Sequence, residues 1–337
     1  MSSETTRSTP GDWVRRTIIC PLEAALFFTL LCLFSILPRR TASFVGGAIA
    51  ASLGPRFSQQ HMRAMSRNMA IAFPELGSEE SAALQRRIWR HFGRVLSQLP
   101  HIARSLRRPH AAADVEVEGA ENLAEAARSG KFLLVGAHLG HWELIGCYAA
   151  MAGYPMAALY TPERNGWIDA MIRFLRRRGS AGSKLIARGP NAVRQMMDVL
   201  KKGHGLFIIV DQRVDDGAWV RYFGKLAQTT TTPARLARRF DCPILLGRAI
   251  LLPKGRYRIS YCKPLRPDLS RDADAEVLAM TQRINDTFES WIREYPDQWL
   301  CMKRRWPKSP KRVKSPSPKL EVGENNPQNR RVPAEVD

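Results

Sequence analysis

Cysteine pairs, clustered metal ligands and long uninterrupted hydrophobic runs are all scarce in this 337-residue sequence. The six cysteines are widely scattered and no two form a CxxC pair, so they provide neither a disulfide framework nor a zinc ligand set. Acidic residues are also few, 31 against 52 lysines and arginines, which gives a formal net charge of +21. The cysteine pattern favours a reducing compartment, and we expect neither a metal nor another cofactor.

The longest cleanly apolar run is short for a membrane span. It covers only the 14 residues from Ala24 to Leu37, within a 21-residue stretch that a proline and a glutamate interrupt. Fourteen residues suit a half-inserted helix or the core of a signal peptide, whereas 21 residues with an acid near one end can cross a bilayer. Because Pro38-Arg39-Arg40 follows the run directly, we favour an uncleaved membrane anchor over residues 17–40, after a flexible amino terminus of residues 1–16.

The positive charge is spread along the chain rather than confined to its carboxyl end. The tail from Lys303 to Asp337 contains ten basic and four acidic residues, so most of the excess charge lies in the rest of the protein. A basic body behind a membrane anchor favours an anionic lipid headgroup, a phosphorylated substrate or an acidic carrier protein as partner. Nucleic acid is a rival partner, but we find no aromatic-interleaved basic strand, helix-turn-helix pattern or zinc spacing, so we expect no nucleic-acid binding.

The order of periodic segments predicts an α/β domain behind a helical region. Residues 41–110 have the periodicity of helices, and residues 111–306 alternate apolar strands with amphipathic helices. This alternation predicts a mainly parallel central sheet flanked by helices, with a turn at Tyr222-Phe223-Gly224 and a hairpin at Pro253-Lys254-Gly255. The predicted strands are Val115–Glu118, Phe132–Gly136, Met156–Tyr160, Lys184–Ala187, Leu206–Val210, Ile244–Ala249 and Arg256–Tyr261. Residues 307–337 are rich in proline, serine, lysine and asparagine, and we expect a disordered basic tail there.

The best candidate for chemistry is the segment FLLVGAHLGHWE, from Phe132 to Glu143. Its apolar strand delivers His138 to a tight turn, and α/β sheets place their functional residues at such strand ends. In one continuous helix His138 and Glu143 would point about 140° apart, so they can meet only if His138 precedes the helix. We then expect Glu143 to accept a hydrogen bond from one imidazole nitrogen and to leave the other free to take a proton. The alternative is a histidine that only caps or packs, because this spacing arises readily by chance.

Further polar residues lie where predicted strands and helices end. Arg176 borders the apolar stripe of an amphipathic helix and is placed to reach a cleft, although arginines in a last turn also complement the helix dipole. Arg188 follows a predicted strand and precedes Gly189-Pro190, a position suited to binding phosphate. Asp211 and Gln212 follow another strand directly, and an ordinary turn aspartate would explain Asp211 equally well.

These signals, in this order, resemble the bacterial lipid A late (secondary) acyltransferases of the lauroyl and myristoyl type. The resemblance covers residues 22–306. The signals are the amino-terminal hydrophobic helix, Arg67-Asn68 through Ala72-Phe73-Pro74, GAHLGHWE, Asp211-Gln212, Tyr222-Phe223-Gly224 with TTTTPARLA, and the closing PDQWLCMKRRWP. The His-x4-Glu box alone is shared by glycerolipid acyltransferases generally, whereas the ordered set is specific. The chain departs from the family pattern at Thr161, where the family often has arginine, and at His141, where asparagine is common.

The resemblance implies transfer of a fatty acyl chain from an acyl carrier protein thioester to a hydroxyl of a lipid A precursor, in lipopolysaccharide biosynthesis. It also implies an enzyme in the cell inner membrane with its catalytic domain facing the cytoplasm. His138 would be the general base with Glu143 as its partner, and Arg176 and Asp211 fall where the family has functionally important residues. The missing arginine at Thr161 leaves other lipid acceptors open, such as a phosphatidylinositol mannoside or a lysophospholipid, and so does a catalytically silent lipid-binding homologue.

The expected chemistry suits these residue types. A positioned imidazole that removes the hydroxyl proton contributes about 10²- to 10⁴-fold to the rate. Attack on a thioester develops an oxyanion, which backbone N–H groups around Gly140 are placed to stabilise. We expect Arg176, Arg188, Asp211 and Gln212 to bind substrate, with the arginines holding phosphate groups bidentately.

Overall fold

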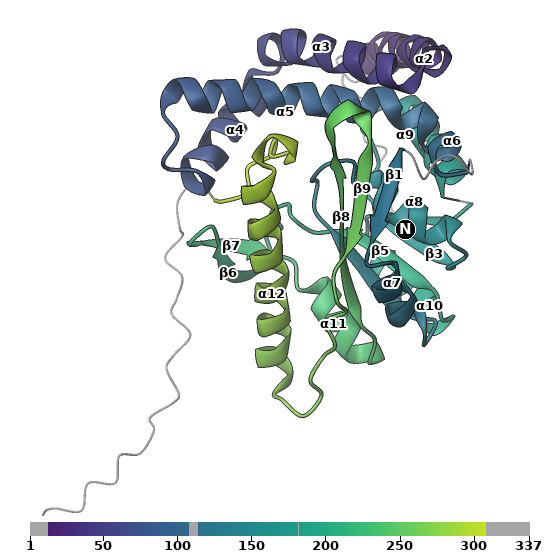
Figure 1. Ribbon diagram of the computed structural model, residues 1–337, viewed down its shortest axis with the longest axis vertical. Helices are drawn as coiled ribbons and strands as arrows, with labels where there is room; N and C mark the ends of the chain where they lie inside the picture. The colour runs from purple at the N-terminus through teal and green to yellow at the C-terminus, as the bar shows by residue number, and fades with distance from the viewer. Residues whose placement is uncertain (1–12, 108–113, 181, 308–337) are drawn as a thin grey trace, which may run out of the picture. The chain divides into compact units, whose positions relative to one another are not determined.

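A seven-stranded sheet forms the centre of the computed structural model, which describes residues 13–107, 114–180 and 182–307 (Figure 1). Within these residues β8 and β9 pair antiparallel, and every other neighbouring pair in the sheet is parallel. The strands, in their order across the sheet, are β1 (Val115–Glu118), β9 (Tyr257–Tyr261), β8 (Ile244–Leu251), β2 (Phe132–Gly136), β5 (Gly205–Ile209), β3 (Met156–Tyr160) and β4 (Lys184–Ala187). The predicted α/β class with a mainly parallel sheet is confirmed.

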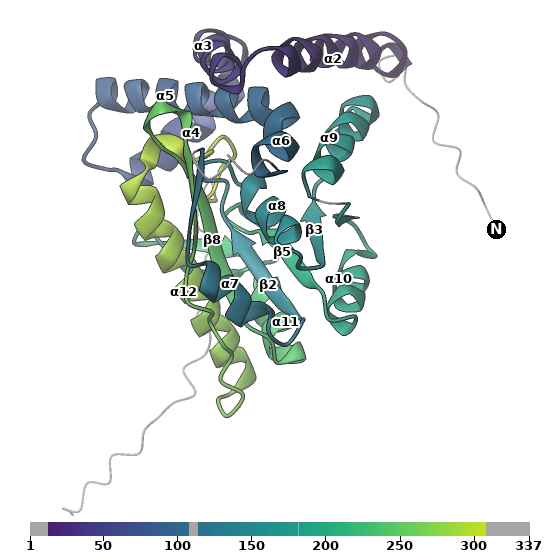
Figure 2. The same ribbon diagram turned by 45° about the vertical axis from the view of Figure 1, so that its right-hand side comes forward.

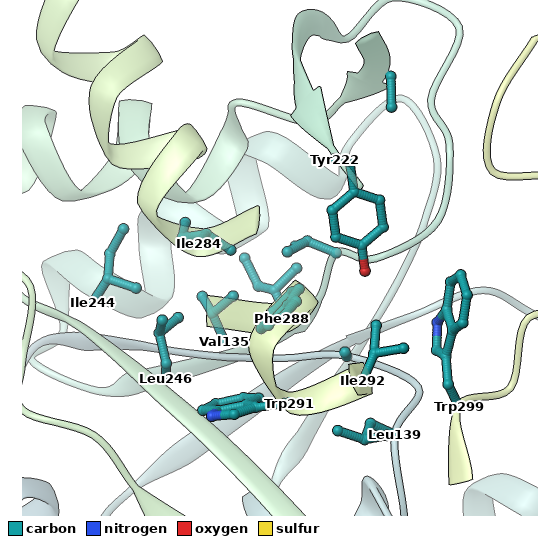
Figure 3. Packing of buried hydrophobic residues seen from close by; sticks show 14 of the residues in the cluster. Val135, Leu139, Tyr222, Ile244, Leu246, Ile284, Phe288, Trp291, Ile292 and Trp299 are labelled. Carbon is teal, nitrogen blue, oxygen red and sulfur yellow. The ribbon is translucent and has the colours of Figure 1, made fainter. Parts of the chain in front are cut away.

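Helices cover both faces of this sheet, which explains why its central strands β2 and β5 are continuously apolar. Side chains alternate between the faces along a strand: Leu133 and Val135 of β2 join one core cluster, whereas Phe132 and Leu134 join the other. Figure 3 shows the first cluster, in which Phe288 packs close to Val135. The helices on this face are α10 (Ala192–Lys201), α11 (Thr232–Phe240) and α12 (Ala273–Glu294), and those on the other face are α7 (Ala120–Ala127) and α8 (Glu143–Met151).

One structural feature was missed at the level of sequence. β6 (Ala218–Tyr222) and β7 (Lys225–Thr229) form a separate antiparallel hairpin, where only the turn at Tyr222-Phe223-Gly224 was predicted. Phe223 and Gly224 both have positive φ, 50° and 69°, as the tightest hairpin turns require. These strands were not predicted because neither AWVRY nor KLAQT is a continuous apolar run or a regular alternation of apolar and polar residues.

The amino-terminal part of the described chain is helical throughout, as predicted. A turn of π-helix (Arg15–Ile19) runs into α2 (Cys20–Ile36), and the chain turns at Pro38 into α3 (Arg39–Phe57). The next helices are α4 (Gln59–Ala72), α5 (Ser78–Gln98), a 3-10 turn (Leu99–His101) and α6 (Ile102–Arg107). The flexible terminus expected at 1–16 and the tail expected at 307–337 lie almost entirely outside the described residues.

Within the described residues, one helical segment, Arg15–Ile36, is long and apolar enough to cross a membrane. It has 22 residues and a mean hydropathy of 2.1, and 17% of its most apolar window is buried. At about 1.5 Å per residue its length is comparable to the hydrocarbon core of a bilayer. The acid that interrupts it, Glu23, accepts a hydrogen bond from the Asn165 amide (3.1 Å). This helix supports association with a membrane.

Helices α3 and α5 approach so closely that only glycine fits at their contact. A Cβ atom added to Gly93 of α5 would lie 2.1 Å from the carbonyl oxygen of Gly46 in α3, and one added to Gly46 would lie 2.5 Å from Cβ of Ser97. Contacts this short require the helices to move apart. The glycines therefore determine how the amino-terminal helices sit on the rest of the fold.

We expect Gly93→Ala to lower the free energy of unfolding by about 1–3 kcal/mol, because the added methyl group overpacks the contact. Denaturant unfolding of the purified protein in detergent measures this change. Gly166→Ala is the matched control, because a Cβ atom there meets nothing within 4 Å. Equal stability of the two variants would contradict the proposed close contact.

Candidate active site

Polar side chains from separate segments gather at the carboxyl ends of the parallel strands. His138 follows β2 and precedes α8, Asp211 and Gln212 follow β5, and Arg188 follows β4. Arg176 comes from the last turn of α9 (Gly166–Gly179), which lies with α8 near this end of β3 in Figure 2. The predicted placement of His138 before the helix is confirmed.

The partner of His138 is Asp211 and not Glu143. Nδ1 of His138 lies 2.6 Å from Oδ1 of Asp211, and Oδ2 of Asp211 accepts a hydrogen bond from the Trp299 indole at 3.2 Å. The expected contact with Glu143 is wrong because β5 adjoins β2 in the sheet, so its end brings Asp211 directly beside the histidine. Asp211 was expected to bind substrate, but only 4% of the residue's surface is exposed. Its carboxylate contacts the imidazole instead.

Burial and pairing act in opposite directions on the Asp211 carboxyl group. Burial raises its pKa, but the charge of His138 and the hydrogen bonds from His138 and Trp299 lower it more, so the pKa lies below the ordinary value. The carboxylate is therefore ionised at neutral pH and accepts a hydrogen bond from Nδ1. That interaction places the imidazole proton on Nδ1 and leaves Nε2 as the acceptor.

Glu143 pairs instead with Arg176. Nη2 of Arg176 lies 2.6 Å from Oε1 of Glu143, and Nε lies 3.0 and 3.1 Å from the two carboxylate oxygens. Burial raises the pKa of Glu143, but the charge of Arg176 and its hydrogen bonds lower it more, so the pKa is below normal. The pair forms because Glu143, in the first turn of α8, faces α9 rather than the histidine turn. Arg176 also stacks over the ring of Tyr160, 6.0 Å from its centroid.

The turn between His138 and α8 is held by backbone hydrogen bonds. Gly140 has a φ of 60°, and its N–H donates to the carbonyl of Gln298 at 3.0 Å. A Cβ atom at Gly140 would lie 1.9 Å from the carbonyl oxygen of Ala249, so glycine is required for close packing. Because the Gly140 N–H is already occupied, it is not free to stabilise an oxyanion, and the role expected for the backbone N–H groups around Gly140 stays a prediction. The His138 carbonyl accepts from the N–H of Leu300 at 2.8 Å.

A cavity of about 340 Å³ adjoins these residues. His138, Glu143, Arg176, Arg188 and Gln212 all line it, whereas Asp211 does not. Its apolar side is formed by residues such as Leu96, Leu99, Met156, Leu185, Phe207 and Ile209. The cavity therefore combines an imidazole and several cations with a hydrocarbon surface.

Cys147 also lines this cavity, and its thiol is the obvious rival nucleophile. Burial raises the pKa of the thiol far above its ordinary value. The thiol therefore stays protonated at neutral pH and is a weak nucleophile.

A sequence model of the family described as bacterial lipid A biosynthesis acyltransferase matches residues 16–308 of this chain. The chain belongs to this family. A lipid A biosynthesis acyltransferase of Haemophilus influenzae is 23% identical over 82% of this chain and 84% of its own length. A lipid A biosynthesis palmitoleoyltransferase of Escherichia coli K12 is 24% identical over 83% of this chain and 90% of its own length, and a lipid A biosynthesis acyltransferase of Shigella flexneri gives the same values. Acyl transfer in lipid A synthesis is thus the activity that the family supports.

The closing family motif contributes residues to the site whose roles were not foreseen. Trp299 supports Asp211, and the segment that carries it is tied to Asn68, whose Nδ2 donates to the carbonyls of Cys301 (2.8 Å) and Lys303 (2.7 Å). Arg305 is buried, and its guanidinium donates to Oγ1 of Thr229 at 2.5 Å. The asparagine, threonine and PDQW segments were recognised as family signals, but their mutual contacts join positions more than 70 residues apart.

Two further imidazoles are buried: that of His141, within the turn between His138 and α8, and that of His91, on α5. His141 and His91 are 1% and 5% exposed, and both ring nitrogens of His141 and Nε2 of His91 lack a hydrogen-bond partner among the described residues. Burial lowers the pKa of each from 6.5 to about 4. Both rings are therefore neutral in the folded protein at neutral pH.

We expect stability to fall as the pH decreases from 6.5 to about 4, because over that range the unfolded chain protonates both histidines and the folded protein does not. The loss is on the order of 3 kcal/mol per histidine. His141→Asn should remove about half of the combined loss from the two histidines, and it should change stability little at pH 7. Unfolding measured in detergent at pH 7 and pH 4.5 tests this. The exposed His61→Asn serves as control and should keep the full acid loss, and an unchanged acid loss in His141→Asn would contradict the argument.

Proposed function

We propose that this protein transfers a fatty acyl chain from an acyl carrier protein thioester to a hydroxyl group of a lipid A precursor, with His138 as general base. The observation that carries the proposal is the buried Asp211 carboxylate 2.6 Å from Nδ1 of a histidine that lines a largely apolar cavity. Family membership supports the same reaction type. The apolar helix Arg15–Ile36 supports association with a membrane, and we propose the inner membrane, with the catalytic domain on the cytoplasmic side.

The proposed step begins with the proton of the acceptor hydroxyl. Nε2 of His138 takes this proton while the hydroxyl oxygen attacks the thioester carbonyl carbon. The tetrahedral intermediate then collapses, the carbon–sulfur bond breaks, and the imidazolium returns the proton to the leaving thiolate. Asp211 holds the ring orientation throughout and stabilises the imidazolium, because its carboxylate is buried and ionised.

Arg176 and Arg188 supply positive charge to the cavity wall, where the phosphate groups of an acceptor would bind. We assign Glu143 the role of a positioning residue, because its ion pair holds the Arg176 guanidinium in place. Gln212 lies beside the imidazole, with Nε2 3.4 Å from Nε2 of His138, and so borders the position of the attacking hydroxyl. The apolar side of the cavity suits the acyl chain of the donor.

We assign the donor to an acyl carrier protein. The chain has a formal net charge of +21, which attracts an acidic carrier protein, but coenzyme A is also anionic through its phosphate groups. Coenzyme A thioesters are the comparison that tests this assignment.

We expect His138→Ala to lower kcat by about 10²- to 10⁴-fold, and Asp211→Asn to lower it by a comparable factor because the amide no longer fixes the tautomer. Glu143→Gln should mainly raise KM for the acceptor, because it releases Arg176. The assay uses membranes, acyl carrier protein thioesters and a lipid A precursor. His204→Ala, outside the cavity lining, is the control. Transfer that survives in His138→Ala refutes the mechanism, and no transfer by the wild type favours a lipid-binding homologue.

Mass spectrometry of lipid A from cells with and without the protein tests the acceptor. We expect a mass difference of one acyl group, because a single transfer adds one chain and releases the carrier thiol. The difference also identifies the acyl length. Unchanged lipid A together with an altered phospholipid or glycolipid would point to another lipid acceptor.

A further inference from the structure

A second cavity, of about 500 Å³, lies beside the amino-terminal helices. It is bordered by α3, α5 and the turn that joins β8 to β9 (Pro253–Gly255), and it is open to solvent. Figure 1 shows this hairpin extending to α5, on which α3 packs. The lining contains residues of three segments that are far apart in sequence, so it is formed by the tertiary structure.

The lining of this second cavity is strongly basic. It includes Arg39 and Arg40 of α3, Arg94 of α5 and Lys254 of the turn. Asp114 pairs with both arginines of α3, at 2.9 Å from Nη2 of Arg39 and 3.3 Å from Nη2 of Arg40. No ion pair involves Arg94 or Lys254 in the part of the chain that the structure describes, so the cavity has an excess of positive charge after Asp114 is counted.

Gln98 adds a buried donor to the same lining. The residue is 2% exposed, and its Oε1 accepts a hydrogen bond from the Tyr257 hydroxyl at 2.8 Å. Its Nε2 has no hydrogen-bond partner among the described residues. A buried amide without a partner is costly, and most such groups in proteins are satisfied. The cations and this amide are all donors, so the ligand that suits them is an anion with several acceptor oxygens.

The surroundings of the cavity indicate that this anion belongs to a lipid. Phe44 lines the cavity and is 71% exposed, and three further apolar residues of α3 (Ile49, Leu53 and Phe57) are also exposed. Helix α3 directly follows the one described helix that could cross a membrane. Basic residues next to such a helix attract anionic lipid headgroups at the membrane surface.

The cavity is separate from the proposed acyl-transfer site. The described residues that line the two cavities include none in common. Helix α5 lies between them: its residues Val95 and Leu96 face the acyl-transfer cavity, whereas Arg94 and Gln98 face the basic one, roughly 130° around the helix. A lipid in the basic cavity would thus not be the one that reacts at His138.

We propose that this basic cavity binds the phosphate of an anionic membrane glycerophospholipid, which holds the amino-terminal helices against the membrane surface. The phosphate oxygens accept hydrogen bonds from Arg40, Arg94, Lys254 and Gln98, and the acyl chains lie along Phe44. The lipid is neither donor nor acceptor in acyl transfer.

The test is a titration of the full-length protein in neutral detergent with short-chain phosphatidylglycerol, followed by native mass spectrometry. Arg40→Gln/Lys254→Gln removes two exposed cations of the cavity and keeps the Arg39–Asp114 pair. Lys201→Gln/Lys202→Gln, at the end of α10, removes the same charge elsewhere. We expect the wild type and the α10 control to bind one lipid with similar affinity, and the cavity variant to bind it about tenfold more weakly. A short-chain phosphatidylcholine, which is zwitterionic, should bind more weakly than phosphatidylglycerol.

Three results would overturn the proposal. An equal loss of affinity in the α10 control would show that binding depends on the net charge of the protein and not on the basic cavity. Competition by millimolar inorganic phosphate as effective as that by lipid would make the cavity a free-phosphate site. Displacement of phosphatidylglycerol by the lipid A precursor, with a raised acceptor KM in the cavity variant, would assign the cavity to the acceptor. If the double variant melts below the wild type by circular dichroism, Lys254→Gln alone takes its place, with Lys201→Gln as control.

Discussion

The buried contact between Asp211 and His138 is the constraint on which the site depends. A carboxylate this deep in the protein is stable only when it is paired and hydrogen-bonded, and His138 and Trp299 together provide these partners. Trp299 belongs to a segment that Asn68 holds in place from the helical region. The imidazole is thus oriented by residues from three distant parts of the chain. The family motifs that contain these residues contact one another in the folded protein.

Two carboxylates at the site have separate tasks because each has its own partner. Asp211 pairs with His138, and Glu143 pairs with Arg176 on the wall of the same cavity. Each is ionised because its partner outweighs the effect of burial. Glu143 itself lines the cavity, so its negative charge is balanced there by Arg176, and Arg188 adds a further positive charge to the same lining.

Much of the fold could be predicted because its strands have clear patterns. β1 to β4 begin and end at the predicted residues: β2 and β3 are apolar runs, and β1 alternates valine with glutamate. The β6–β7 hairpin was missed because its strands are neither continuous apolar runs nor regular alternations. Placement of polar residues at strand ends also followed from the pattern: His138, Arg188, Asp211 and Gln212 all lie where strands of the parallel sheet end. The occupied N–H of Gly140 was beyond prediction, since its acceptor, the carbonyl of Gln298, is 158 residues away.

The order of residues along the chain was enough to establish the α/β class, the histidine turn before a helix, and the apolar helix near the amino terminus. The tertiary structure decided which carboxylate serves the histidine. Spacing relates residues along one segment, whereas Asp211 reaches His138 because β5 is hydrogen-bonded to β2. Strand order also places Arg176 beside Glu143 and assembles the basic cavity from α3, α5 and the β8–β9 turn. Hydrogen bonds and ion pairs depend on distance through space, which is settled only when the sheet and its helices pack together.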